Sequence, residues 1–366
     1  MGVEDEPSVE AIATLVPATL RALHALEFAA RYLAPDTLPR LIDAVAGRGE
    51  DVNAALAASQ SAAWPTGLEA VRDCLERAAA AAGEGLSGLA AAADAPQPLR
   101  AAWRALRNHA RGAEAIYPLA AHLGPVSRFF LEPAGREDRR VLDRLDAAEP
   151  GRENVGVMHV GGPPGTRGAF SLYVPEYYDA AHSLPLVVAL HGGSGNGGVF
   201  LWSWLREART RGLILIAPTA RGATWSLMEP EIDGPNIDDM VAQVAGEWQI
   251  DSSRQLLTGM SDGGTFTYVL GLRAGCRFTH LAPIAASFHP LLMTFADADR
   301  VRGLPVHIVH GRHDWMFPPE MAQEAARSLR QTGAHVVCRE IADLAHSYPR
   351  DENGAILDWF MDAGGN

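Results

Sequence analysis

The feature that most constrains the fold of this chain is an apolar run that breaks into a tight, glycine-rich turn. Residues Leu256–Thr258 are followed by Gly259–Gly263, which has the spacing G-x-S-x-G, and then by the helix-compatible stretch Thr265–Ala274. This order predicts a strand, a sharp turn and a helix. Such a turn is crowded, and the two glycines fit it because they have no side chains. Ser261 between them is then pushed out above a sheet.

The helix predicted after this turn has a chemical consequence for Ser261. The first N–H groups of a helix have no partner within it, and they carry the positive end of the helix dipole. They would therefore face any anion that forms at the serine. A serine hydroxyl is a poor nucleophile until a base removes its proton. The motif alone is a weak signal, because glycine and serine are common in turns. The interpretation therefore depends on whether the rest of the chain supplies the base.

Two strand ends downstream offer the required partners. The buried run Val306–His310 leads to Asp314, and the run Val336–Ile341 leads to His346. We predict that His346 is the base and that Asp314 holds its imidazole in the tautomer that faces the serine. Asp343 is the alternative acid, but it lies only three residues before His346 and can bond locally.

An upstream strand leads into a second glycine-rich loop. Residues Leu186–Leu190 run into His191-Gly192-Gly193-Ser194. We expect the backbone N–H groups of Gly193 and Asp262 to form an oxyanion hole, with that of Ser194 as a substitute. The carboxylate of Asp262 would oppose an oxyanion, so we expect it to turn away and to cap a helix or bond a neighbouring loop.

These motifs, read together, resemble the α/β-hydrolase superfamily. They are HGG at 191–193, GMSDGG at 259–264, HGRHD at 310–314 and AHSY at 345–348. Within the superfamily the chain is similar to serine esterases of the phospholipase/carboxylesterase and polyhydroxybutyrate depolymerase-like groups, over roughly residues 150–366. These groups more often carry a neutral residue at the position of Asp262.

The last two-thirds of the chain alternate strand and helix. Most of the strands are continuously apolar, as strands buried on both faces must be. We therefore predict an α/β-hydrolase fold, with a mostly parallel eight-stranded sheet, helices on both faces, and site residues at the C-terminal ends of the strands. The predicted strands are Val155–Val160, Ala169–Val174, Leu186–Leu190, Leu213–Ala217, Leu256–Thr258, Leu281–Ala286, Val306–His310 and Val336–Ile341.

The first third is instead helical. Apolar residues recur with a period of 3.6, as in the stripe that contains Leu23, Leu26 and Leu33, and about five helices result. We predict a helical N-terminal domain over residues 1–130, a charged linker over 131–154 and the catalytic domain over 155–366. The helical domain must bury its stripes, either as a lid beside the pocket or as a homodimerisation arm, and we expect it to do both.

Composition excludes several classes of partner. The formal net charge is −13, with 48% hydrophobic and 20% charged residues, so phosphate backbones and anionic membranes are disfavoured. The three cysteines are far apart and form neither a disulfide framework nor a zinc motif. We expect no metal and no cofactor. The N-terminus, Met1–Glu6, is acidic where a secretory signal is basic, which favours the cytoplasm.

The function indicated is a serine carboxylesterase that hydrolyses short- to medium-chain esters of small molecules through an acyl-enzyme on Ser261. An acyl-peptide hydrolase or thioesterase with the same triad is an alternative, and a non-catalytic binding module is another. Candidate substrate-binding residues lie on loops that follow the predicted strands, and the aromatic Trp and Phe residues among them can equally serve packing. The candidates are Ser194, Trp225, His289, Trp315 and Phe317.

Deleting residues 1–130 tests the role predicted for the helical domain. The truncation should expose apolar surface and lower solubility. It should also change acyl-length preference more than the reactivity of Ser261 towards a small fluorophosphonate. Light scattering and a panel of nitrophenyl esters measure both effects. A monodisperse truncated protein with an unchanged mass state and substrate profile would show that the domain is an independent module.

Overall fold

The structure is a computed structural model that describes residues 6–362. It divides into two compact units, Met1–Leu142 and Asp143–Asn366. The division falls inside the predicted linker 131–154, part of which is helical, in η3 (Pro133–Arg136) and α7 (Arg139–Asp146). Residues 1–5, which contributed to the expected cytoplasmic location, lie outside the described residues.

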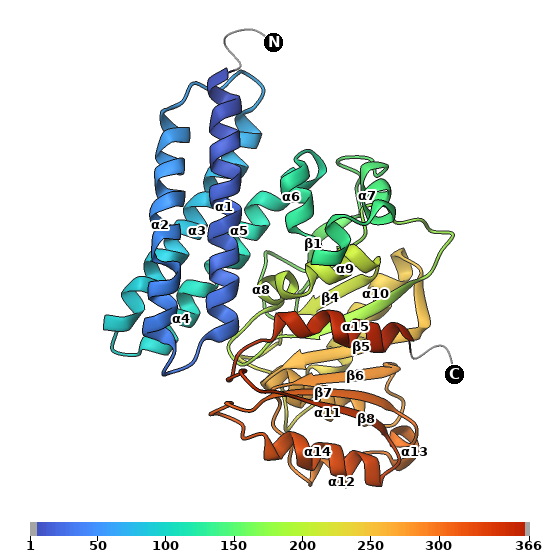
Figure 1. The fold of residues 1–366 in the computed structure, drawn as a ribbon. Coiled ribbons are helices and arrows are strands. Elements are labelled where there is room, and N and C mark those ends of the chain that lie inside the picture. The colour runs from blue at the N-terminus through green and yellow to red at the C-terminus, as the bar shows by residue number, and fades with distance from the viewer. Residues whose placement is uncertain (1–5, 363–366) are drawn as a thin grey trace. The chain divides into compact units, whose positions relative to one another are not determined.

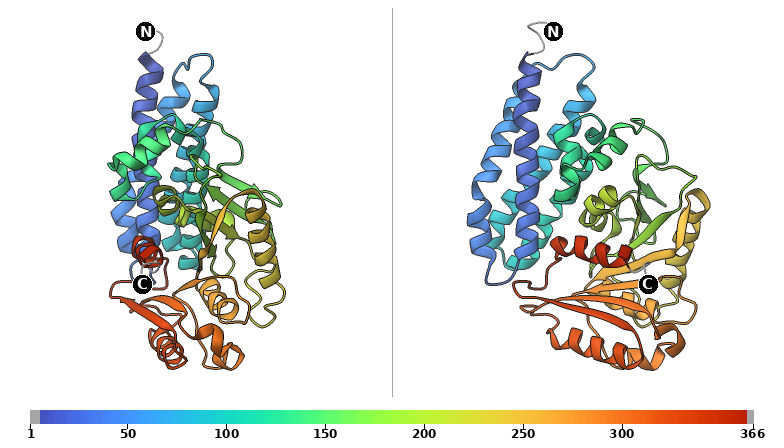
Figure 2. Two further views of the ribbon diagram at one scale, coloured as in Figure 1. Left: turned by 90° about the vertical axis from the view of Figure 1, so that its right-hand side faces the viewer. Right: turned by 45° about the vertical axis from the view of Figure 1, so that its right-hand side comes forward.

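The first unit is built from helices throughout its described part (Figure 1). Three long helices, α1, α2 and α3, contact one another, and α5 packs on α3. Two further views show the long helices side by side (Figure 2). Two short helices, α4 and α5, meet at Arg107. The helices are α1 (Glu6–Tyr32), α2 (Leu38–Ser61), α3 (Glu69–Ala91), α4 (Pro98–Leu106), α5 (Asn108–Ile116) and α6 (Gly124–Phe129), with η1 (Ala92–Asp94) and η2 (Tyr117–Ala121) between them.

The apolar stripes of this unit are buried as the sequence period predicts. Leu23 and Leu26 of α1 are fully buried. Phe129 packs edge-on against Phe130 and His24, with ring centroids 5.0 and 4.8 Å apart, and Phe130 packs against Tyr117 at 5.3 Å. These large side chains thus contact one another inside the first unit.

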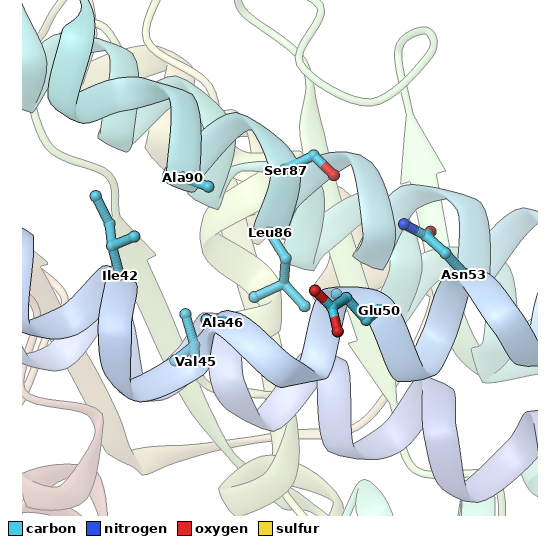
Figure 3. A pocket seen from close by; sticks show the side chains of 9 residues that line it. Ile42, Val45, Ala46, Glu50, Asn53, Leu86, Ser87 and Ala90 are labelled. Carbon is cyan, nitrogen blue, oxygen red and sulfur yellow. The ribbon is translucent and has the colours of Figure 1, made fainter.

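A cavity of about 150 Å³ lies between α2 and α3 (Figure 3). Val45, Leu86 and Ala90 form apolar walls, while Glu50 and Asn53 add polar groups. It contains none of the residues that the sequence nominates for the site.

The second unit is built on a single eight-stranded sheet. Its strand order is β1-β2-β4-β3-β5-β6-β7-β8. The first two strands form an antiparallel hairpin, β2 pairs antiparallel with β4, and all remaining pairs are parallel. The predicted α/β-hydrolase fold is confirmed. The strands are β1 (Gly156–Val160), β2 (Phe170–Val174), β3 (Leu184–Leu190), β4 (Ile214–Pro218), β5 (Ile250–Met260), β6 (His280–Ile284), β7 (Pro305–Gly311) and β8 (His335–Ile341).

Helices cover both faces of this sheet (Figure 1). α9 and α15 contact each other and the sheet on one face, whereas α11 and α14 pack on strands of the other. Parallel strands need these crossover helices, and they bring the carboxyl ends of β3, β5, β6, β7 and β8 to one edge. The helices of this unit after α7 are α8 (Gly197–Phe200), α9 (Leu205–Arg211), α10 (Gly234–Glu247), α11 (Asp262–Gly271), α12 (Leu292–Phe295), α13 (Ala298–Val301), α14 (Glu320–Gln331) and α15 (Asn353–Asp362), with η4 (Leu201–Ser203) and η5 (Arg350–Glu352).

None of the helices within residues 6–362 combines the length and the hydropathy that a membrane span requires.

Two neutral histidines are buried where α15 meets the sheet. His280 on β6 and His307 on β7 each pack edge-on against Trp359, with ring centroids 5.2 Å apart. Burial lowers the pKa of each histidine to about 4. Among the described residues, neither ring nitrogen of His307 has a hydrogen-bond partner, so a proton there would be an uncompensated buried charge.

This arrangement predicts acid sensitivity of the second unit. A histidine whose pKa is lower in the folded state leaves the unfolded chain binding more protons, so the free energy of unfolding falls as the pH drops from about 6.5 towards 4. His307→Leu should flatten that dependence, as measured by urea unfolding at a series of pH values. His335→Leu, at an exposed position, is the control. An unchanged slope in His307→Leu would contradict the prediction.

Candidate active site

Ser261 occupies a strained turn between β5 and α11. Its backbone has φ 55° and ψ −119°, outside the regions that non-glycine residues favour. A Cβ on Gly263 would lie 2.4 Å from the carbonyl oxygen of Leu190, and one on Gly259 would lie 2.5 Å from the carbonyl oxygen of Gly263. Both glycines are therefore required by close packing, as the G-x-S-x-G motif predicts.

The structure brings the three predicted triad residues together. The Oγ of Ser261 lies 3.1 Å from Nε2 of His346, and Nδ1 of His346 lies 2.8 Å from Oδ2 of Asp314. An ionised carboxylate only accepts hydrogen bonds, so Nδ1 carries the proton and Nε2 is free to accept from the serine hydroxyl. All three side chains are buried. Asp343, the alternative acid, is exposed in the turn after β8.

Asp314 is held ionised by its surroundings. Burial acts to raise its pKa, but hydrogen bonds from His346 and from the backbone N–H groups of Phe317 and Met316 outweigh burial and lower it. Oδ1 accepts from those two N–H groups at 2.8 and 2.9 Å. Buried His310 donates from Nε2 to the carbonyl oxygen of Phe317 at 2.8 Å, which fixes the same turn.

The glycine-rich loop after β3 lies against the serine turn. A Cβ on Gly192 would be 3.6 Å from the Cβ of Ser261. Asp262 is the first residue of α11, so its N–H has no partner within the helix. The N–H of Ser194 bonds the carbonyl oxygen of Ala223 at 3.1 Å. Ser194 is thus engaged and is not available as the substitute donor, whereas the hydrogen bonds of the described residues include none from the N–H of Gly193.

His191 fixes the first turn of this loop. The N–H of Ala220 donates to its Nε2 at 3.1 Å, so Nδ1 carries the proton and donates to the carbonyl oxygen of Gly192 at 2.7 Å. Burial lowers the pKa of His191 to about 4, which keeps the ring neutral and this bonding pattern intact.

Trp225 lies beneath the loop rather than in a pocket wall. Its Nε1 donates to the carbonyl oxygen of His191 at 2.7 Å, and its ring stacks on Phe266, with centroids 5.5 Å apart. The side chain is only 3% exposed. The expected substrate contact is therefore replaced by the packing role that the sequence left open.

Two other aromatic candidates do border the histidine. Trp315 and Phe317 meet the ring of His346 edge-on, with centroids 6.1 and 5.3 Å away. Trp315 is 39% exposed, so it presents apolar surface next to the reacting groups. His289 is exposed on the loop after β6, and its Nδ1 accepts from the N–H of Leu291 at 3.2 Å. Among the described residues, no hydrogen bond or ring contact joins His289 to Ser261 or His346.

Sequence reasoning missed Thr224, in the loop after β4. Its Oγ1 donates to Oδ2 of Asp262 at 2.5 Å. The carboxylate of Asp262 thus bonds a neighbouring loop, as expected, but its partner carries no motif that could have identified it. Within the described residues, no group of three or more His, Cys, Asp and Glu side chains is arranged to hold a metal ion.

No protein-family model matches the chain. A bifunctional acetylxylan esterase/xylanase from Neocallimastix patriciarum is 26% identical over 188 residues, which are 50% of this chain and 26% of that protein. A protein named probable feruloyl esterase C, from Aspergillus clavatus, is 32% identical over 130 residues, which are 34% of this chain and 46% of that protein. The chain therefore spans less than half the length of either relative.

Among solved structures, a truncated form of a carbohydrate esterase from gut microbiota is similar to this chain. It is 13% identical, with a TM-score of 0.46, and the match covers 59% of this chain and 99% of the other. The strand order of the eight-stranded sheet is by itself sufficient to define the fold.

The crowding of the serine turn predicts a strong effect of one added methyl group. Gly263→Ala should lower the free energy of unfolding by at least about 2 kcal/mol, because its Cβ would meet the backbone of Leu190 and His191. Gly246→Ala is the matched control in α10, where no atom lies within 4 Å of the added Cβ. That change should leave stability unchanged or raise it by up to about 1 kcal/mol. Urea denaturation checks both, and equal stabilities would refute the packing argument.

Proposed function

We propose that this protein is a serine hydrolase that cleaves carboxylic esters through an acyl-enzyme on Ser261. The observation that carries the proposal is the continuous chain of hydrogen bonds from Ser261 through His346 to Asp314, at 3.1 and 2.8 Å. A nucleophile, a base and a group that orients the base are what acyl transfer requires. The names of the curated relatives, which are esterases, favour ester substrates.

In the first half-reaction, Nε2 of His346 takes the proton of the Ser261 hydroxyl as Oγ attacks the carbonyl carbon of the ester. The charge that develops on the carbonyl oxygen is stabilised by the N–H groups of Gly193 and Asp262, which are fixed before reaction and need no reorganisation. The N-terminus of α11 adds its dipole. His346 then returns the proton to the departing alkoxide, and the acyl group stays on Ser261.

In the second half-reaction, His346 removes a proton from water, and the hydroxide attacks the acyl carbon. Collapse of the second tetrahedral intermediate releases the carboxylic acid, and the proton on His346 goes back to Oγ of Ser261. Asp314 stabilises the imidazolium that forms twice in the cycle. Its lowered pKa keeps it ionised across the neutral range.

We place short- and medium-chain acyl esters of small molecules in the substrate class. The relatives are named for an acetyl ester and a feruloyl ester, one with a small acyl group and one with an aromatic acyl group. Exposed Trp315, beside His346, offers a flat apolar surface to either. A homodimer formed through the helical unit belongs to the same proposal, which the truncation described above tests.

Substitution of the triad tests the proposal directly. Ser261→Ala and His346→Ala should each lower ester turnover by about three orders of magnitude or more, because the first removes the nucleophile and the second removes the base that activates it. Thermal melts that match the wild type would exclude loss of fold as the cause. Wild-type turnover by Ser261→Ala would overturn the assignment.

The same assay distinguishes the two acids. Asp314→Asn should be severe, because the carboxamide no longer fixes the imidazole tautomer. Asp343→Asn should be mild, because Asp343 is exposed and lies outside the hydrogen-bond chain. The reverse ranking would transfer the acid role to Asp343.

A further inference from the structure

The carboxylate of Asp262 lies beside Ser261, where three segments of the chain meet. Asp262 begins α11, and its Oδ2 accepts a 2.5 Å hydrogen bond from Oγ1 of Thr224, in the loop after β4. The same oxygen lies 2.7 Å from where a Cβ on Gly193 would stand. The carboxylate thus occupies the space where a side chain at position 193, in the loop after β3, would stand, and any such side chain would displace it.

Two neighbours of Thr224 bond the same glycine-rich loop. The carbonyl oxygen of Ala223 accepts from the N–H of Ser194 at 3.1 Å, and Nε1 of Trp225 donates to the carbonyl oxygen of His191 at 2.7 Å. The residues on both sides of Thr224 are therefore hydrogen-bonded to the glycine-rich loop, at His191 before Gly193 and at Ser194 after it. The hydrogen bond from Thr224 to Asp262 also links the loop after β4 to the start of α11.

The charge of Asp262 needs a reason, because a carboxylate beside an oxyanion hole opposes the charge that forms there. The N-terminus of α11 compensates part of this cost, since a negative side chain is favourable in the first turn of a helix. A hydrogen bond to a carboxylate is also shorter and stronger than one to a neutral acceptor. The charge of Asp262 is therefore unfavourable for the oxyanion, but it strengthens the hydrogen bond from Thr224.

We propose that Asp262 and Thr224 are positioning residues for the oxyanion hole; this inference rests on the proposed function. Asp262 supplies one donor through its own backbone N–H, and its side chain fills the space beside Gly193, whose N–H is the second donor. A single residue therefore sets the separation of the two donors. Thr224 holds the carboxylate in the rotamer that does so.

Three variants of the full-length chain separate geometry from charge. Thr224→Val and Asp262→Ala should each lower kcat about 10- to 100-fold with KM within about twofold, because misplaced donors lose stabilisation of the transition state rather than substrate binding. Asp262→Asn should retain most of the wild-type kcat, because its amide oxygen still accepts from Thr224 and the opposing charge is gone. Initial rates on a nitrophenyl ester, normalised by fluorophosphonate titration of active sites, give these values.

Inhibition by a trifluoromethyl ketone, which binds serine hydrolases as a hemiketal oxyanion, distinguishes positioning from a loss of folded protein. The Ki of Thr224→Val and of Asp262→Ala should rise by the factor by which kcat/KM falls. Thr332→Val is the matched control, because its Oγ1 donates to the carbonyl oxygen of Ser328 at 3.1 Å, where α14 ends before β8. It should leave kcat and Ki unchanged.

Several results would overturn the inference. One is wild-type kcat and Ki in Thr224→Val and Asp262→Ala, and another is a fall in kcat with no rise in Ki. A loss in Asp262→Asn as large as that in Asp262→Ala would show that charge and not geometry is what matters. Hydrogen exchange separates failure of this inference from failure of the proposed function. Thr224→Val should speed exchange of the Ser194 amide whether or not the protein cleaves esters, and unchanged exchange would refute the positioning role of Thr224.

Discussion

The geometry of the site depends on one residue held in a left-handed backbone conformation between a strand and a helix. A conformation of this kind costs on the order of 1–3 kcal/mol and persists only when its surroundings fix it. Here the N–H of Ser261 bonds the carbonyl oxygen of Ile284 on β6, and its carbonyl oxygen accepts from the N–H of Thr265 in α11. The backbone of Ser261, which follows β5, is thus fixed by hydrogen bonds to both β6 and α11.

The parallel sheet converts this local constraint into a site. Because β3, β5, β7 and β8 run in one direction, the loops that follow them meet at one edge. His191, Ser261, Asp314 and His346 lie in four of these loops. Segments far apart in the sequence become neighbours without any long excursion of the chain, and each loop needs only a few hydrogen bonds to fix its functional group.

The sequence predicted what depends on strand pattern and motif order. Runs buried on both faces are continuously apolar, so β3 and β7 could be located, whereas the start of β5 at Ile250 could not, because its first residues are polar and partly exposed. Ser261, Asp314 and His346 follow strands in an order that a motif describes. The bond from Thr224 to Asp262 and the burial of Trp225 depend on how the loop after β4 folds back, and no local pattern in the sequence encodes that.

The nucleophile follows a central strand of the sheet, whereas the base follows an edge strand. β5 is central and pairs on both sides. β8, which leads to His346, is the last strand of the sheet within the described residues, where it pairs with β7 on one side, and it alternates exposed and half-buried residues along most of its length. Fluctuations that detach an edge strand are smaller in free energy than global unfolding. Under the proposed mechanism, mild heat or denaturant would separate His346 from an intact serine turn. Turnover would then be lost before circular dichroism detects any loss of secondary structure. That loss would measure how strongly the edge strand β8 is held in the sheet.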